Sequence, residues 1–113
     1  MEKLRMRFFL KNPDGSITPS DLEVSWPERA AQAKPSNSSL YVAKAEFPGV
    51  LPDGGGASRR ESNLHALIEI LGSVAQFSTD FEKAGGTLYF AMPDDESKPF
   101  LGEPVKSKRF FRL

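Results

Sequence analysis

The chain has 113 residues, carries 15 basic and 15 acidic side chains for a net charge of zero, and contains no cysteine. This size predicts a single domain with its own core, and the lack of cysteine excludes disulfides, thiolate zinc sites and thiol nucleophiles. No apolar run approaches the roughly 20 residues of a membrane span, and basic residues interrupt the N-terminal region, so we expect a cytoplasmic protein that does not enter membranes.

The first predicted element is a strand over residues 3–11, where apolar and basic side chains alternate. Every second residue from Leu4 to Leu10 is apolar, which predicts a buried face, while the other face carries the basic residues and Phe9. The segment Asn-Pro-Asp-Gly that follows predicts a tight turn. Residues 22–26 also alternate, and predict a second strand that is antiparallel to the first and ends at Pro27.

The next part of the chain predicts a third strand between two loops. Residues 28–39 consist largely of Ala, Gln, Lys, Pro, Ser and Asn, a composition that is typical of an exposed loop. Residues 40–47 predict a strand, which Pro48 and Gly49 end. Residues 50–57 predict a second loop, because they contain three successive glycines.

The clearest element is a helix over residues 58–86. Ser58 and Glu61 have the spacing of a capping box, and Gly85-Gly86 provides a stop. Its apolar residues recur at intervals of three and four, with Ser78 as the polar interruption, and form one stripe: Leu64, Leu67, Ile68, Leu71, Val74, Ala75 and Phe81. A stripe of this width predicts that the helix packs on a sheet.

The C-terminal part predicts one more certain strand and two surface segments. Residues 87–92 predict a fourth strand, residues 94–104 an irregular surface segment, and residues 105–113 a terminal strand or tail. The fold class that follows is α+β. We expect one domain over residues 1–113 in which an antiparallel sheet of four to five strands, in the order β-β-β-α-β with or without a terminal strand, has one amphipathic helix packed on one face.

This order of elements resembles small bacterial domains of unknown function that consist of a strand meander, a helix and a final strand. The resemblance rests on residues 22–26, residues 40–47, the apolar stripe of the helix, and Gly85-Gly86-Thr87-Leu88. It covers about two thirds of the chain. Because all of these features are folding signals, the resemblance implies a bacterial or phage origin and imports no activity.

The sequence contains no motif for catalysis. His65 is the only histidine, which excludes a Ser-His-Asp triad and a multi-histidine metal site within one chain. It lies one helical turn from Glu61 and Glu69, where a solvated histidine is favoured over a metal ligand. The acidic run at residues 94–96 lacks EF-hand spacing and predicts a solvated turn. We therefore expect a non-enzymatic protein without a cofactor or metal.

The glycine-rich loop offers the elements of an anion site. Gly55 and Gly56 precede a predicted helix N-terminus that contains Arg59 and Arg60, and backbone amides, helix dipole and guanidinium groups all favour a phosphate. However, the lysine of a P-loop is absent, and there is no G-x-G-x-x-G pattern. A flexible connection between strand and helix is the alternative interpretation.

The aromatic and basic residues predict a function in binding. A sheet that is covered by one helix leaves its other face, or an edge strand, open to a partner, and the residues expected there are Arg5, Arg7, Phe9 and Tyr41. The expected partner is another protein, as for an immunity protein or an inhibitor. A second copy of the chain that pairs through an edge strand is another version of this hypothesis.

Nucleic acid is the alternative partner, because basic residues gather at both ends of the chain. Residues 1–11 carry four basic side chains against one acidic, and residues 98–113 carry five against one, among them Lys106, Lys108, Arg109 and Arg112. Aromatic side chains beside arginine can stack on bases. The zero net charge argues against this alternative, since affinity for nucleic acid is chiefly electrostatic.

Overall fold

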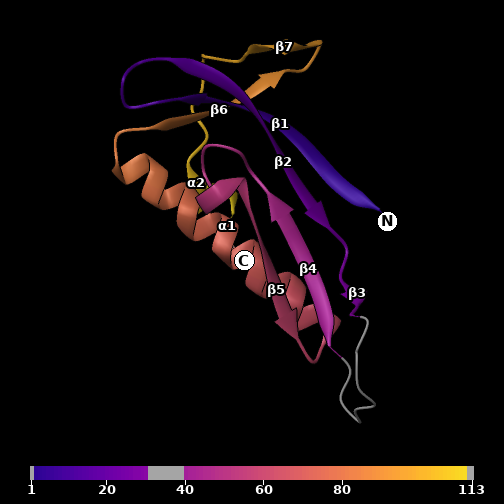
Figure 1. Cartoon of the computed structure of the whole chain (residues 1–113). Coiled ribbons are helices and arrows are strands. Elements are labelled where there is room, and N and C mark those ends of the chain that lie inside the picture. Colours follow the sequence, from indigo (N-terminus) through magenta and orange to yellow (C-terminus); the bar gives the residue numbers. More distant parts are fainter. Residues whose placement is uncertain (1, 31–39, 112–113) are drawn as a thin grey trace.

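A computed structural model describes residues 2–30 and 40–111, and shows an antiparallel sheet with one long helix across it (Figure 1). The strands in the described residues are β1 (Lys3–Lys11), β2 (Ile17–Ser25), β3 (Glu28–Arg29), β4 (Tyr41–Glu46), β5 (Gly55–Arg60), β6 (Thr87–Met92) and β7 (Asp95–Pro99). The helical segments are η1 (Pro52–Gly54), α1 (Asn63–Lys83) and α2 (Ser107–Phe110). The predicted α+β class is confirmed, with seven strands rather than four or five.

The β1–β2 hairpin is the centre of the sheet. The two strands pair over their full length, from Lys3 opposite Ser25 to Lys11 opposite Ile17. The predicted turn joins them: the Asn12 amide donates to the Ser16 carbonyl over 2.8 Å, and Gly15 takes a φ of +93° that favours glycine. β2 then pairs with β4, which also pairs with β3 and β5, and β1 pairs with β6, which leads to β7.

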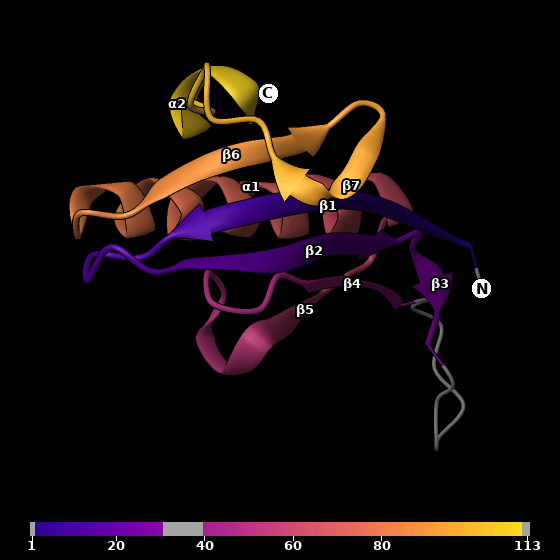
Figure 2. The same ribbon diagram turned by 90° about the horizontal axis from the view of Figure 1, so that it is seen from above.

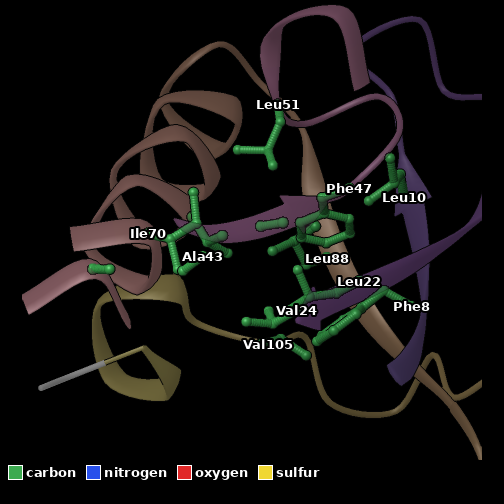
Figure 3. Close-up of a cluster of buried hydrophobic side chains, with 13 residues drawn as sticks. Phe8, Leu10, Leu22, Val24, Ala43, Phe47, Leu51, Ile70, Leu88 and Val105 are labelled. Carbon is green, nitrogen blue, oxygen red and sulfur yellow. The ribbon is translucent and has the colours of Figure 1, made fainter. Parts of the chain in front are cut away.

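The two faces of this sheet differ in chemistry. The helix face holds the core, formed by even-numbered residues of the hairpin with residues of β4, β6 and α1 (Figure 3). The fully buried members of this core include Phe8, Phe47, Val74 and Leu88. The opposite face carries the odd-numbered residues of β1 and their charged neighbours on β2, and we call it the charged face. Alternation along β1 therefore predicts correctly which side chains share a face.

α1 is the predicted helix, but it begins at Asn63 rather than at Ser58. Its buried residues are Ala66, Ile70, Val74 and Ser78, so the predicted stripe is wrong at Leu64 and Ile68, which are exposed. The expected capping box is wrong, because Ser58 belongs to β5 and its hydroxyl donates to Glu69 over 2.8 Å. The glycine stop is present: Gly85 follows the helix with a φ of +102°, and a Cβ on Gly86 would lie 2.3 Å from the Phe81 ring. The helix thus ends where its sequence predicts. It starts later than predicted, because β5 occupies the first residues of the predicted helix.

The C-terminal segment lies on the helix face beside α1 and β6, as Figure 2 shows for α2. The Val105 amide donates to the Leu88 carbonyl over 2.8 Å, and both the amide and the hydroxyl of buried Ser107 donate to Glu82. The ring of Phe110 lies 5.8 Å from that of Phe8. Residues 105–111 are therefore a single bridge and a short helix, instead of the expected strand or tail.

Further segments differ from prediction. The second strand begins at Ile17 rather than at residue 22, and Glu28–Arg29 of the expected exposed loop form β3. Residues 94–104, expected to be irregular, contain β7, which forms a hairpin with β6. The expected loop at residues 50–57 contains η1 and the start of β5. Residues 31–39 of the expected exposed loop, and Arg112 in the basic C-terminus, lie outside the described residues.

Candidate interaction site at the open edge of β1

The N-terminal half of β1 has a free edge on the side away from β2. β6 pairs with β1 only between Phe8 and Lys11, so within the described residues no strand pairs with Lys3–Arg7 on that side. The hairpin bonds decide which backbone groups are exposed there. The Trp26 amide donates to the Glu2 carbonyl and the Asn12 amide to the Ser16 carbonyl.

Both of these bonds involve even-numbered residues that directly flank β1, and hydrogen-bonded pairs alternate along an antiparallel ladder. Even-numbered residues of β1 therefore bond to β2, and the backbone N–H and C=O groups of Lys3 and Arg5 point to the other side. We call this segment, Lys3–Arg7, the open edge. It presents a template for pairing with another strand.

A cleft of about 550 Å³ borders the open edge at the point where β6 leaves β1. Arg5, Met6 and Arg7 form its β1 side, and the β6–β7 hairpin, with Phe90, Met92, Glu96 and Phe100, forms the other. Figures 1 and 2 both show β7 beside β1. We call this hollow the fork cleft. An Arg5 nitrogen, Nη1, lies 3.8 Å from Glu96 Oε2, so Arg5 spans it.

Beside the fork cleft, β1 exposes apolar side chains on its helix face. Met6 is 43% exposed and Leu4 is 57% exposed, although both share a face with the buried Phe8. The expectation that this whole row is buried is therefore wrong at its N-terminal end. A second hollow of about 370 Å³ shares Phe90 and Phe100 with the first and extends it to Phe110.

On the charged face beside the open edge, one carboxylate binds two arginines. Asp21, on β2, accepts hydrogen bonds from both Arg7 and Arg5, the latter over 3.0 and 3.1 Å. Hydrogen bonding by Arg7, and then by Arg5, keeps the pKa of Asp21 below its usual range. The hydrogen bond between Arg7 and Asp21 also raises the pKa of Arg7. Lys3 lies 3.6 Å from Glu23, so the basic row of β1 is largely paired within the molecule.

The four residues expected to form a protein-binding surface do not come together. Arg5 and Arg7 lie side by side at the open edge. Phe9 shares their face but is buried, with 5% of its surface exposed, between Pro19 and Tyr89 in the strand register. Tyr41 lies on β4, on the helix face, where it packs against the core. Only the two arginines remain candidates for contact with a partner.

The elements of the expected anion site are separated by β5. Gly55 and Gly56 begin this strand opposite Glu46 and Ala45, and α1 starts beyond its other end. A Cβ on Gly55 would lie 2.9 Å from the Ala45 carbonyl oxygen, so glycine permits the approach of the two strands. The premise of a glycine loop at a helix N-terminus is therefore wrong.

The arginines of this segment also diverge. Arg60 forms an ion pair with Glu69 on α1, while Arg59 is exposed on the opposite face of β5. The pKa of Glu69 is lowered by the Ser58 hydroxyl and then by Arg60. These contacts join β5 to the helix.

Among the described residues, β5 pairs with β4 alone, so it provides a second free edge, but a less favourable one. Its sequence, Gly-Gly-Ala-Ser-Arg-Arg, has no large apolar side chain that a partner could pack against. The open edge of β1 has such residues, Leu4 and Met6, together with a cleft. We therefore place the candidate site at β1.

Sequence reasoning missed most residues of this site. Met6, Phe90, Glu96 and Phe100 come from three strands and the segment after β7, and nothing in their local pattern relates them. The available signal in the sequence is the apolar pair Phe100 and Leu101, which follows the polar residues 94–98. The register at which β6 leaves β1 determines the cleft.

The described residues offer no other chemical centre. They contain no group of three or more His, Cys, Asp or Glu side chains placed to hold a metal ion. Among them, no helix has the length and apolar character needed to cross a membrane. Comparisons of the chain with protein-family models, with curated proteins and with solved structures find no match. The resemblance to small bacterial domains stays a prediction.

Proposed function

We propose that this protein is a non-enzymatic interaction domain that binds another protein by accepting an extended segment along the open edge of β1. The observation that supports this proposal is the free backbone of Lys3 and Arg5 beside the fork cleft. Addition of a strand to a sheet edge is a common form of peptide recognition: main-chain hydrogen bonds give affinity, and flanking side chains give specificity. An immunity or inhibitor role is one version of this function.

The open edge favours this mode over binding through the exposed sheet face. Phe9 is buried, and Arg5, Arg7 and Lys3 are engaged by Asp21 and Glu23. The same pairing weakens the nucleic-acid alternative, because guanidinium groups that are already paired neutralise fewer phosphates and displace fewer counterions from the nucleic acid. The exposed cations at and beside α2, Lys106, Lys108 and Arg109, remain available for that alternative.

The proposal is tested by removing one backbone donor. Arg5→Pro deletes an N–H that points to the open edge, while the β1–β2 hydrogen bonds, which use even-numbered residues, stay in place. The tagged protein is used to capture partners from a nuclease-treated lysate of cells that naturally express it. We expect a stoichiometric protein partner to bind the wild-type chain and to be lost with Arg5→Pro.

Arg5→Ala is the matched control, because it removes the same side chain and keeps the amide. The partner should bind this variant more strongly than it binds Arg5→Pro. Equal capture by the wild-type chain and Arg5→Pro would contradict edge pairing. A partner that disappears after nuclease treatment would favour nucleic acid instead.

A further inference from the structure

On the basis of this proposed function, we infer that the segment bound at the open edge alternates acidic with apolar residues. Alternation follows from strand geometry, because successive side chains of an added strand point to opposite faces of the sheet. On the charged face, the added strand would lie beside the row of Lys3, Arg5 and Arg7. On the helix face, it would lie beside Leu4 and Met6, which are exposed.

β2 shows which residues β1 accepts on its paired edge. In the register of the hairpin, Arg7 faces Asp21 and Arg5 faces Glu23, while Met6 faces Leu22. Both arginines thus lie opposite an acid, and the apolar residue between them lies opposite an apolar residue, whereas Lys3 lies opposite Ser25. A partner that repeats this pattern on the other edge would gain cross-strand pairs of the same kind.

β2 does not engage every donor of the β1 cations. Arg5 uses Nε and Nη2 to donate to Asp21, and its Nη1 faces the fork cleft, where Glu96 lies at 3.8 Å. That distance is longer than a hydrogen bond, and the Glu96 side chain is 67% exposed. A carboxylate on the bound segment can therefore take the place of Glu96. The geometry assigns Glu96 the role of a weak internal competitor.

A second copy of the chain fits this edge poorly. Two antiparallel β1 edges related by a two-fold axis at Arg5 place this residue opposite its own copy, and Lys3 opposite Arg7. Like charges directly opposite one another destabilise a strand pair. Charge complementarity therefore selects an acidic segment over self-pairing.

The test uses synthetic peptides and the full chain. The first peptide, acetyl-Ser-Asp-Leu-Glu-Val-Ser-amide, copies residues 20–25, and a control replaces its Asp and Glu with Lys. Binding is followed by amide chemical shifts in two-dimensional NMR. We expect the acidic peptide to shift the amides of Lys3 and Arg5, and the lysine peptide to bind at least tenfold more weakly.

Two variants separate pairing from charge. Arg5→Pro should weaken binding of the acidic peptide about fivefold or more, because it removes one backbone hydrogen bond of about 1 kcal/mol together with a cation. Glu96→Gln should strengthen binding about twofold to threefold, since it removes the internal competitor. Glu96 contributes no core contact, so this variant keeps the fold intact.

Equal binding of the two peptides, or weaker binding to Glu96→Gln, would overturn the inferred chemistry. Shifts confined to β5 would overturn the assigned edge. If neither peptide binds while Arg5→Pro still abolishes capture of a cellular partner, the inference fails and the proposed function stands. Concentration-dependent shifts at Lys3 and Arg5 without peptide would indicate a second copy and would also overturn the inference.

Discussion

At the scale of single residues, Asp21 connects stability to pH. Its pKa is lowered in the folded chain, so its contribution to stability is complete above the unfolded pKa of about 3.9 and is lost as pH falls through the lower folded value. Its side chain is 27% exposed, which limits the effect of the ion pairs. We expect Asp21→Asn to destabilise the protein by about 1 kcal/mol at pH 7 and by less near pH 2, measured by urea unfolding.

Glu61→Gln is the control for this change, because it removes one charge from an exposed side chain outside the ion pairs found in the described residues. It should leave stability at pH 7 nearly unchanged. Equal losses for Asp21→Asn at pH 7 and pH 2 would show that Asp21 acts through packing rather than through its charge.

At the scale of elements, the C-terminal segment depends on one carboxylate. Ser107 is fully buried, and Glu82 accepts both its amide, over 2.8 Å, and its hydroxyl. Glu82→Ala leaves these donors unpaired, which costs about 1–3 kcal/mol. We expect residues 105–111 to detach and hydrogen exchange at the Val105 and Phe111 amides to accelerate.

Glu82→Gln retains an acceptor oxygen and should lose less stability than Glu82→Ala. Unchanged protection of the Val105 amide in Glu82→Ala would mean that the bond to Leu88 and the aromatic contacts of Phe110 hold the segment without Glu82. That result would contradict the role given to this carboxylate.

The elements also show what the sequence can and cannot predict. Local alternation predicts that β1 is a strand, and three- and four-residue spacing predicts that α1 is a helix, but the spacing does not predict where α1 begins or which of its apolar residues are buried. β5 has a sequence of small and basic residues with low strand propensity, and it is a strand because it pairs with β4 over its whole length. β7 likewise depends on its hairpin with β6. Pairing between distant segments decides these cases.

The candidate site is predictable only in part for the same reason. Arg5 and Arg7 follow from the basic row of the first strand, but Phe9 is buried on the face where alternation predicts exposure. Met6 is exposed on the face where alternation predicts burial. Both outcomes depend on where β6 and the C-terminal segment cover the sheet, and local periodicity carries no information about that.

At the scale of the whole molecule, the cations of the open edge have a second consequence. Charged side chains on an exposed strand are a common protection against pairing between identical edges. We expect the wild-type chain to be monomeric at about 100 µM. We expect a triple variant, Lys3→Thr, Arg5→Thr and Arg7→Thr, to form dimers through paired β1 edges, because threonine favours strands and removes the like charges.

Sedimentation equilibrium tests this prediction, because it measures the mass of each variant in solution. The control is the variant Lys3→Thr, Arg5→Pro and Arg7→Thr, which has lost the same three cations but lacks one amide at the open edge. It should stay monomeric if dimers form by strand pairing. Dimerisation of both variants would point to the exposed apolar residues Leu4 and Met6 instead, and a wild-type dimer that Arg5→Pro dissociates would show that the cations do not prevent self-pairing. In that case, the cations of β1 would not explain why the open edge stays available to a different protein.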